Sequence, residues 1–198
     1  MKKKIAFFDF DGTITTKDTL LEFLKFAKGT FRFYLGFLLS APYLVAMKLG
    51  LFPNQKAKEK VLTFFFKGMT VTQFKRYCVD FSKQELPALI RPKAITEIKE
   101  LQAKGFEVVL VSASPENWIC HWAEEMKLQL LASKLEVVDG KVTGKLIGKN
   151  CYGEEKVSRI CEFYTLSEYD DIFAYGDTKG DHAMLQLASK KNYKPFRN

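Results

Sequence analysis

This chain of 198 residues has only four cysteines, a short apolar run before Asp9 and fewer acidic than basic residues. Each of these features argues against certain classes of protein. Its four cysteines include no Cys-x-x-Cys pair, which argues against a disulfide framework or a zinc site and favours a reduced, cytoplasmic protein. The apolar run that precedes Asp9 is only about four residues long, so we expect no secretory signal. Acidic residues are outnumbered, 23 against 31 Lys and Arg, and the formal net charge is +8. This charge favours anionic partners. Because basic and aromatic residues do not alternate in any motif, we expect no nucleic-acid binding.

The composition is that of a globular protein, with 47% hydrophobic and 27% charged residues. Continuous apolar runs predict buried strands over residues 4–10, 106–111 and 171–175, separated in the second half of the chain by helical patterns. Shorter strands are predicted at 128–131 and 135–138, and Asp139-Gly140 predicts a hairpin turn. This order predicts an α/β fold with a Rossmann-like parallel sheet.

Between the first and second strands the chain shows only helical patterns, and many of its 18 phenylalanines fall there. We therefore predict a catalytic α/β core formed by residues 1–14 and 86–198, with a small all-helical cap over residues 15–85 inserted after the first strand. Sites in open α/β sheets form at the carboxyl ends of the strands, so this insertion begins beside the expected site and could act as a lid.

Polar residues follow each of the three main strands. Asp9 and Asp11 end the first strand, Ser112 ends the second, and Asp177 and Asp181 follow the third. We also expect Ser114 to cap a helix that begins at Pro115. Each of these residues, taken alone, is typical of an ordinary polar loop, and Lys156, taken alone, is typical of a solvated lysine on a helix. Together they are harder to dismiss, because strand ends converge in this fold.

The ordered set Asp9-Phe10-Asp11-Gly12-Thr13, Ser112, Lys156 and Gly176-Asp177 with Asp181 resembles the motifs of the haloacid dehalogenase superfamily, in particular its phosphoserine-phosphatase-like branch. The resemblance implies a nucleophilic Asp9 that forms an aspartyl phosphate, and an Asp11 that acts as general acid and base. It implies that Mg²⁺ is held by Asp9, Asp11 and Asp177, with Asp181 orienting a metal-bound water. Ser112 and Lys156 would bind the phosphoryl oxygens.

Two positions depart from the phosphoserine phosphatases. Asp18 stands where those enzymes carry a glutamate for the substrate amino group, and their cap arginine has no clear counterpart, with Lys60 the nearest candidate. The implied phosphatase chemistry therefore transfers to this chain more safely than recognition of serine does.

Residues 33–47 form an apolar stretch without charge, flanked by Arg32 and Lys48. A membrane span needs about twenty residues, so we favour a packed cap helix or a helical hairpin broken near Pro42. The alternative is a lipid-facing element with basic flanks, and the stretch also resembles phosphatidylglycerophosphate phosphatases of the same superfamily.

From the sequence we expect a Mg²⁺-dependent phosphomonoester phosphatase that acts on a small phosphorylated metabolite in the cytoplasm. Two alternatives stay open. One is a lipid-phosphate phosphatase bound peripherally to the inner face of the membrane through residues 33–47. The other is a catalytically inactive binding module, against which the presence of Asp9, Asp11, Ser112, Lys156 and Asp177 argues.

Overall fold

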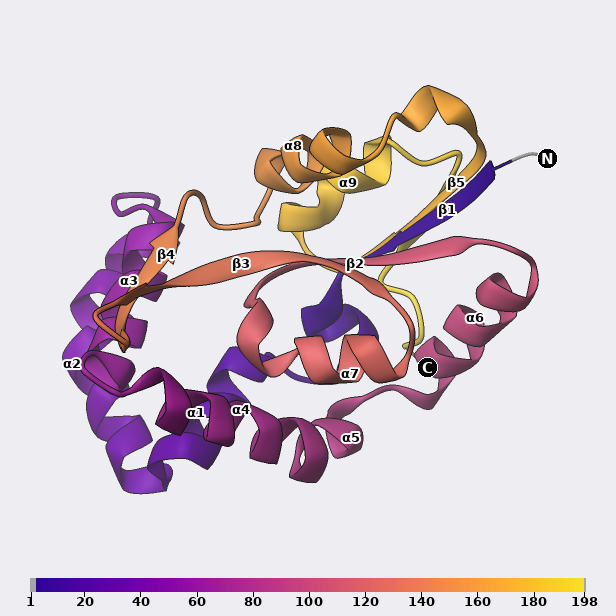
Figure 1. The fold of residues 1–198 in the computed structure, drawn as a ribbon. Coiled ribbons are helices and arrows are strands. Elements are labelled where there is room, and N and C mark those ends of the chain that lie inside the picture. The colour runs from indigo at the N-terminus through magenta and orange to yellow at the C-terminus, as the bar shows by residue number, and fades with distance from the viewer. Residues whose placement is uncertain (1–2, 198) are drawn as a thin grey trace.

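The computed structural model describes residues 3–197 as an α/β fold built on one six-stranded sheet (Figure 1). The spatial order is β4-β3-β2-β1-β5-β6, and every neighbouring pair is parallel except β3 and β4. The strands are β1 (Lys3–Phe8), β2 (Glu107–Pro115), β3 (Gln129–Val138), β4 (Lys141–Ile147), β5 (Tyr169–Gly176) and β6 (Lys190–Tyr193). The α/β class and the helical insertion after the first strand are confirmed.

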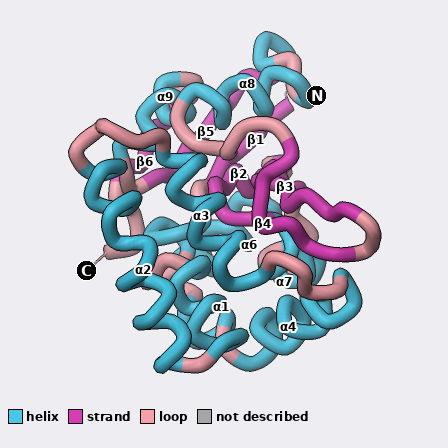
Figure 2. Tube along the Cα trace, turned by 90° about the vertical axis from the view of Figure 1, so that its left-hand side faces the viewer, coloured by secondary structure: helices cyan, strands magenta, loops and turns pink. Residues whose placement is uncertain are grey.

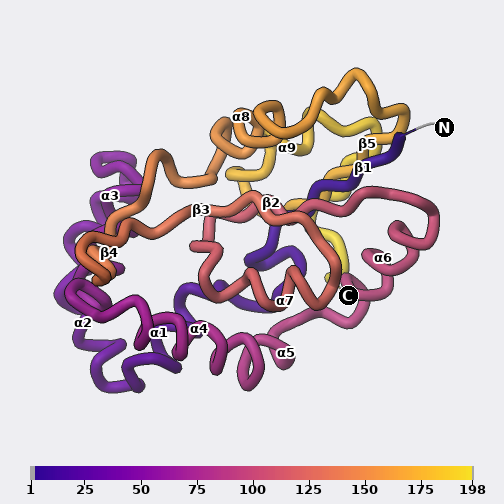
Figure 3. Tube along the Cα trace, in the orientation of Figure 1, coloured from indigo at the N-terminus to yellow at the C-terminus, as the bar shows by residue number. Residues whose placement is uncertain are grey.

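The central position of β1 explains its continuous apolar sequence. The chain's first strand lies between β2 and β5, which come from its second half (Figure 3). Ala6 and Phe8 face one side of the sheet and Ile5 and Phe7 face the other, and all four are fully buried. The first side is covered by α6 (Pro92–Ala103) and α7 (Cys120–Glu125), and the second by α8 (Glu154–Phe163) and α9 (His182–Gln186).

The inserted segment consists of α1 (Thr19–Lys28), α2 (Thr30–Lys48), α3 (Asn54–Phe66) and α4 (Val71–Gln84), followed by the short α5 (Leu86–Leu89). Its clustered phenylalanines form an aromatic core around Phe23, whose ring lies 4.6–5.8 Å from those of Phe66, Phe74, Phe81 and Trp118. The segment is also joined to the hairpin of β3 and β4 by backbone hydrogen bonds, among them Gly68 N–H to the Val142 carbonyl at 2.9 Å. The division into core and cap stays a prediction, although these helices gather at one end of the molecule (Figures 1 and 2).

Several local predictions were wrong. The two short strands expected at 128–138 are one strand, β3, and β6 was not predicted. Ser114 and Pro115 do not start a helix, because β2 continues through Pro115 and Ser114 turns its hydroxyl to Asp11 instead. The final helix is shorter than expected, because residues 179–181 form a separate 3₁₀ turn.

The apolar stretch also differs from the prediction. α2 is a single helix that passes through Pro42 without a break. Gly36 lets this helix approach α3 closely, because a Cβ atom at that position would lie 2.3 Å from the ring of Phe65. The packing of α2 against α3 therefore outweighs the tendency of glycine and proline to break a helix. The expectation of a packed interior was wrong as well, since Phe33, Gly36 and Ser40 are the buried residues of this helix.

Candidate active site

The site lies where the loops after β1, β2 and β5 meet at the carboxyl edge of the sheet. Asp9 follows β1 directly, donates its N–H to the Tyr175 carbonyl at 2.9 Å, and is buried. The chain then turns sharply over residues 10–14. Gly12 makes this turn possible, because its φ is +82° and a Cβ atom there would lie 2.5 Å from Asp177 Oδ2. The turn thus places Gly12 against Asp177, which follows the neighbouring strand β5.

Lys156, at the start of α8, is the buried cation of the site, with only 1% of its surface exposed. Its Nζ donates to Asp9 Oδ1 at 2.6 Å, to Asp181 Oδ1 at 2.7 Å and to the Val111 carbonyl at 2.7 Å. Burial alone would lower the pKa of Lys156, but the two carboxylates outweigh it and hold the pKa above its ordinary value. Lys156 therefore stays charged and ties β1, β2 and the loop after β5 to one point.

Three carboxylates surround that point. Asp9, Asp177 and Asp181 each offer an oxygen, and these oxygens lie within 4.8 Å of one another. The Thr13 hydroxyl lies between two of them, 3.0 Å from Asp9 Oδ2 and 3.3 Å from Asp177 Oδ1. Burial raises the pKa of Asp9 to about 7, with Lys156 opposing the shift, and burial also raises the pKa of Asp177. Adding a cation would relieve this crowding of negative charge.

Asp181 differs from the other two carboxylates because its own loop holds it. Its Oδ2 accepts hydrogen bonds from the N–H groups of Asp177 and Thr178, at 3.1 and 2.9 Å, and from the Thr178 hydroxyl at 2.9 Å. Burial opposes its ionisation, yet Lys156 and these donors prevail and keep the pKa of Asp181 below its ordinary value. Asp181 therefore shapes the loop that presents Asp177.

The Asp11 side chain turns away from this cluster toward the insertion. Its Oδ1 accepts from the N–H and hydroxyl of Thr19, at 2.7 and 2.6 Å, and its Oδ2 accepts from the Ser114 hydroxyl at 2.6 Å. Trp118 Nε1 in turn donates to the Thr19 hydroxyl at 3.1 Å. The Asp11 carboxylate is thus fixed at the wall of the pocket, apart from the three carboxylates described above.

A cavity of about 200 Å³ opens at these residues and is lined by Asp9, Asp11, Asp18, Lys156, Asp181 and their neighbours. Ser112 is fully buried behind Ser114, whose N–H it accepts at 3.0 Å. Asp18 caps α1 through the Leu21 N–H at 3.2 Å and reaches the rim of the cavity. Lys60 is not brought to the site: it is exposed on α3, with its Nζ 5.3 Å from the centre of the Tyr43 ring.

The cation that the insertion does bring to the cavity is Lys58, which was not predicted as a site residue from the sequence. Its Nζ donates to the Ala113 carbonyl at 2.9 Å and to Asn150 Oδ1 at 3.1 Å. Burial lowers its pKa, and the neighbouring Asp11 and Asp18 oppose that shift. Lys58 lies two residues before Lys60 on α3, and the sequence alone does not show which of the two lysines faces the site.

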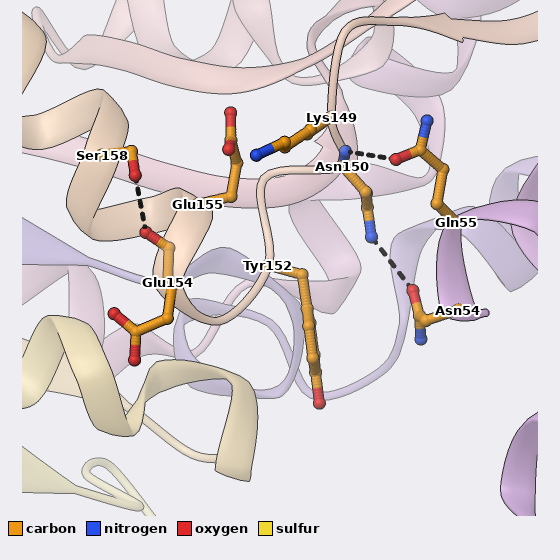
Figure 4. A pocket seen from close by; sticks show the side chains of 8 residues that line it. All are labelled: Asn54, Gln55, Lys149, Asn150, Tyr152, Glu154, Glu155 and Ser158. Carbon is orange, nitrogen blue, oxygen red and sulfur yellow. Dashed lines mark hydrogen bonds between the residues drawn. The ribbon is translucent and has the colours of Figure 1, made fainter. Parts of the chain in front are cut away.

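A second cavity, of about 330 Å³, adjoins the first along the seam between the insertion and the core, and the two share Asn54 and Tyr152. Figure 4 shows Asn150 there, linked to both Asn54 and Gln55 of α3. The distances are 3.0 Å from Asn150 Nδ2 to Asn54 Oδ1 and 3.1 Å from Asn150 N–H to Gln55 Oε1. These contacts fix the start of α3 beside the site.

Arg197 is another residue of the site that was not predicted from the sequence. Its Nη2 lies 2.6 Å from Asp177 Oδ2. Strand β6, which was not predicted, makes this contact possible, because it runs parallel to β5 and carries the chain toward the site. No signal in the sequence links positions 177 and 197.

The donor set fits a hard divalent cation. Asp9 and Asp177 offer carboxylate oxygens, which are the ligands that Mg²⁺ prefers, and few protein ligands suffice because Mg²⁺ keeps several waters. Asp9, Asp177 and Asp181 also carry more negative charge than Lys156 can balance. The site can therefore bind a divalent cation next to a buried carboxylate.

Fold and site together define an α/β protein with an acidic centre at the carboxyl edge of its sheet and a helical insertion after β1. The model of the haloacid dehalogenase-like hydrolases matches residues 6–186, and the chain belongs to that family. Protein CicA of Caulobacter vibrioides is 37% identical over 194 residues, 96% of this chain and 85% of CicA. A probable phosphatase of Mycobacterium tuberculosis is 30% identical over 191 residues, 91% of this chain and 65% of that protein.

Solved structures share the fold. A Bordetella pertussis protein of unknown function superimposes with a TM-score of 0.83 at 19% identity, covering 96% of this chain and 89% of that one. A phosphoserine phosphatase solved as a phospho-aspartyl intermediate analogue superimposes with a TM-score of 0.63 at 23% identity, covering 96% and 86%. The expected superfamily is confirmed, and phosphoserine phosphatases are among the similar proteins and structures, in agreement with the expected phosphoserine-phosphatase-like branch.

Proposed function

We propose that this protein is a Mg²⁺-dependent phosphomonoester phosphatase that acts through an aspartyl phosphate on Asp9. The observation that carries the proposal is the buried Lys156, which holds Asp9 by one hydrogen bond and Asp181 by another while Asp177 lies within reach of both. The description of the Mycobacterium tuberculosis relative as a probable phosphatase supports the same reaction.

In the proposed first step, a carboxylate oxygen of Asp9 attacks phosphorus and the bond from phosphorus to the ester oxygen breaks. The leaving alkoxide takes a proton from Asp11, which Thr19 and Ser114 hold at the cavity wall. Lys156 offsets negative charge on the phosphoryl oxygens from a fixed, desolvated position. Asp9 now carries the phosphoryl group as an acyl phosphate.

In the second step Asp11, now ionised, accepts a proton from water, and the oxygen of that water attacks phosphorus. The bond between Asp9 and phosphorus breaks, which releases inorganic phosphate and restores both carboxyl groups. Mg²⁺ bound by Asp9 and Asp177 would neutralise phosphoryl charge, which lowers the barrier to attack by an anionic nucleophile. Lys58 and Asp18 lie on the alcohol side of the cavity, where they are placed to contact the rest of the substrate.

The test is hydrolysis of para-nitrophenyl phosphate with Mg²⁺ and with excess chelator. Turnover should require Mg²⁺ and should be inhibited by beryllofluoride, which mimics a phosphorylated aspartate. Asp9→Asn should lower kcat by several orders of magnitude, because an amide cannot form the acyl phosphate. The matched control is Asp170→Asn, the same chemical change at an exposed position of β5, which should leave kcat unchanged. Full activity in chelator or in Asp9→Asn would disprove the mechanism, and no turnover by the wild type would favour a binding module.

A further inference from the structure

α2 lies at the end of the molecule that the insertion occupies (Figure 2). Its outer side exposes a stripe of apolar side chains. Phe31 is 81% exposed, Leu38 71% and Leu49 68%. Further exposed members follow at helical spacing: Tyr34, Leu35, Leu39, Val45 and, just beyond the helix, Leu51. Soluble monomers seldom expose apolar side chains in so continuous a patch, and such patches mark partner or membrane contacts.

The helix meets the length and composition required of a membrane span, with a mean hydropathy of 1.3 over an 18-residue window that is 17% buried. Its inner side is nevertheless engaged by the protein. Gly36 lies against the Phe65 ring of α3, and Lys25 of α1 lies over the Phe33 ring with its Nζ 5.0 Å from the ring centre. Because this inner side is held against α3, the helix is suited to lying in a membrane surface rather than crossing the bilayer.

The charges around the stripe are of one sign. Between Glu22 and Glu59 the sequence contains no acidic residue. Arg32, Lys48, Lys56 and Lys60 are exposed there, at both ends of α2 and on the neighbouring α3. Glu59 itself is held inward, where its Oε1 accepts from Leu146 N–H at 3.3 Å. Lys56 is paired with Glu59, whose Oε2 lies 3.5 Å from its Nζ. The exposed cations Arg32, Lys48 and Lys60 therefore flank the apolar stripe, and this arrangement complements an anionic lipid surface.

Behind the stripe, an apolar cavity of about 480 Å³ lies between α1, α2 and α3. Leu21, Phe37, Leu44, Met47 and Val61 supply its apolar wall. It shares Asp18, Leu20, Asn54 and Lys58 with the catalytic cavity, so the two cavities adjoin at these residues. A site with a polar catalytic end and an apolar extension is shaped for an amphiphile.

We propose that α2 docks this protein on anionic membranes and that its substrate is an amphiphilic phosphomonoester whose apolar part occupies the cavity between α1, α2 and α3. The substrate assignment rests on the proposed phosphatase function, and it takes up the lipid-phosphate alternative in place of the small phosphorylated metabolite expected from the sequence. Docking does not depend on catalysis, because none of the stripe residues lines the catalytic cavity. In this arrangement Lys60 is a lipid-facing cation rather than a substrate ligand.

Docking is tested by sedimentation with vesicles of phosphatidylcholine alone and of phosphatidylcholine mixed with phosphatidylglycerol. Wild-type protein should bind the mixed vesicles, and added salt should weaken binding. Leu38→Glu should weaken it by roughly tenfold or more, because the change removes an inserted side chain and adds repulsion. The matched control is Phe163→Glu on α8, a residue that is 66% exposed and lies off the stripe. Loss of binding in both variants, or none in the wild type, would overturn the proposal, as would a dimer abolished by Leu38→Glu, since a second copy would then cover the stripe.

The substrate class is tested with a series of linear alkyl phosphates below their aggregation concentrations. kcat/KM should rise up to about fourfold for each added CH₂ until the cavity is filled. Leu44→Ser should flatten this rise, and Leu38→Glu should preserve it, because Leu44 lines the cavity and Leu38 faces outward. A flat series in the wild type would overturn the amphiphile assignment. If para-nitrophenyl phosphate also failed to react, the proposed phosphatase function would be at fault instead, and vesicle binding would still decide the docking claim.

Discussion

Replacing Lys156 with methionine tests how strongly the site depends on its buried cation. The ammonium group is 1% exposed and makes three hydrogen bonds of 2.6–2.7 Å, two of them to carboxylates. Methionine fills a similar volume but leaves Asp9 and Asp181 buried beside each other without a counter-charge. The cost therefore comes less from the lost bonds than from two carboxylates that must stay desolvated or take up protons.

Removing one partner of a buried ion pair typically costs about 3–5 kcal/mol. That is a large share of the roughly 5–15 kcal/mol by which a domain is stable. With a denaturant dependence of about 2–3 kcal/mol per molar urea for a chain of this size, the unfolding midpoint should fall by roughly 1–2 M. Mg²⁺ should recover part of the loss, because a cation beside Asp9 and Asp177 supplies the missing positive charge.

The assay is urea unfolding followed by the fluorescence of the buried Trp118 and Trp122, with and without Mg²⁺. A double variant, Lys156→Met with Asp181→Asn, should be less destabilised than the sum of the two single variants, because it removes one unpaired charge along with its partner. A loss below about 1 kcal/mol in Lys156→Met, or strict additivity in the double variant, would refute the view that these charges are coupled and desolvated.

Three further predictions concern the same site. Asp11→Asn should lower kcat/KM for alkyl phosphates by about 10²–10⁴-fold and lower it less for para-nitrophenyl phosphate, whose leaving group needs no proton, although hydrolysis of the aspartyl phosphate slows for both; equal losses of kcat/KM would contradict the general-acid role. Arg197→Ala should lower the Mg²⁺ concentration needed for half-maximal activity by up to about fivefold, because the half-exposed guanidinium competes with the metal for Asp177; a higher requirement would show that Arg197 supports the metal site. Gly12→Ala should lower the free energy of unfolding by more than about 1 kcal/mol, because φ is left-handed at this position and the new Cβ would clash with Asp177 Oδ2. The clash should also weaken Mg²⁺ binding measured by calorimetry, and an unchanged Mg²⁺ affinity would show that the turn can adjust.

Much of the architecture was predictable because it depends on local patterns. β1 is apolar on both faces since it is the central strand of a covered sheet, and such a strand reads as a continuous apolar run. Once the strands are parallel, their carboxyl ends must share one edge, so the residues that follow them were expected to meet. The placement of Asp9, Asp177, Asp181 and Lys156 around one point agrees with that expectation.

Features that depend on contacts between distant segments were not predictable. Ser114 reads locally as a helix cap, but an acceptor 103 residues away, Asp11, takes its hydroxyl. Lys58 and Lys60 look equivalent in the sequence, and only the rotation of α3 against the core decides which of them reaches the cavity. Arg197 reaches Asp177 through a strand whose four residues carry no apolar pattern of their own.

The apolar stretch of α2 shows most clearly which features follow from the sequence and which depend on the tertiary structure. Its composition follows from the sequence alone: a helix of 19 residues whose only charges are Arg32 and Lys48. Whether such a helix is buried depends on how much partner surface the rest of the fold supplies, because apolar side chains are hidden only where another element covers them. The insertion covers one side of α2 and leaves Phe31, Leu38 and Leu49 uncovered, which is a property of the tertiary structure that no periodicity in the sequence encodes.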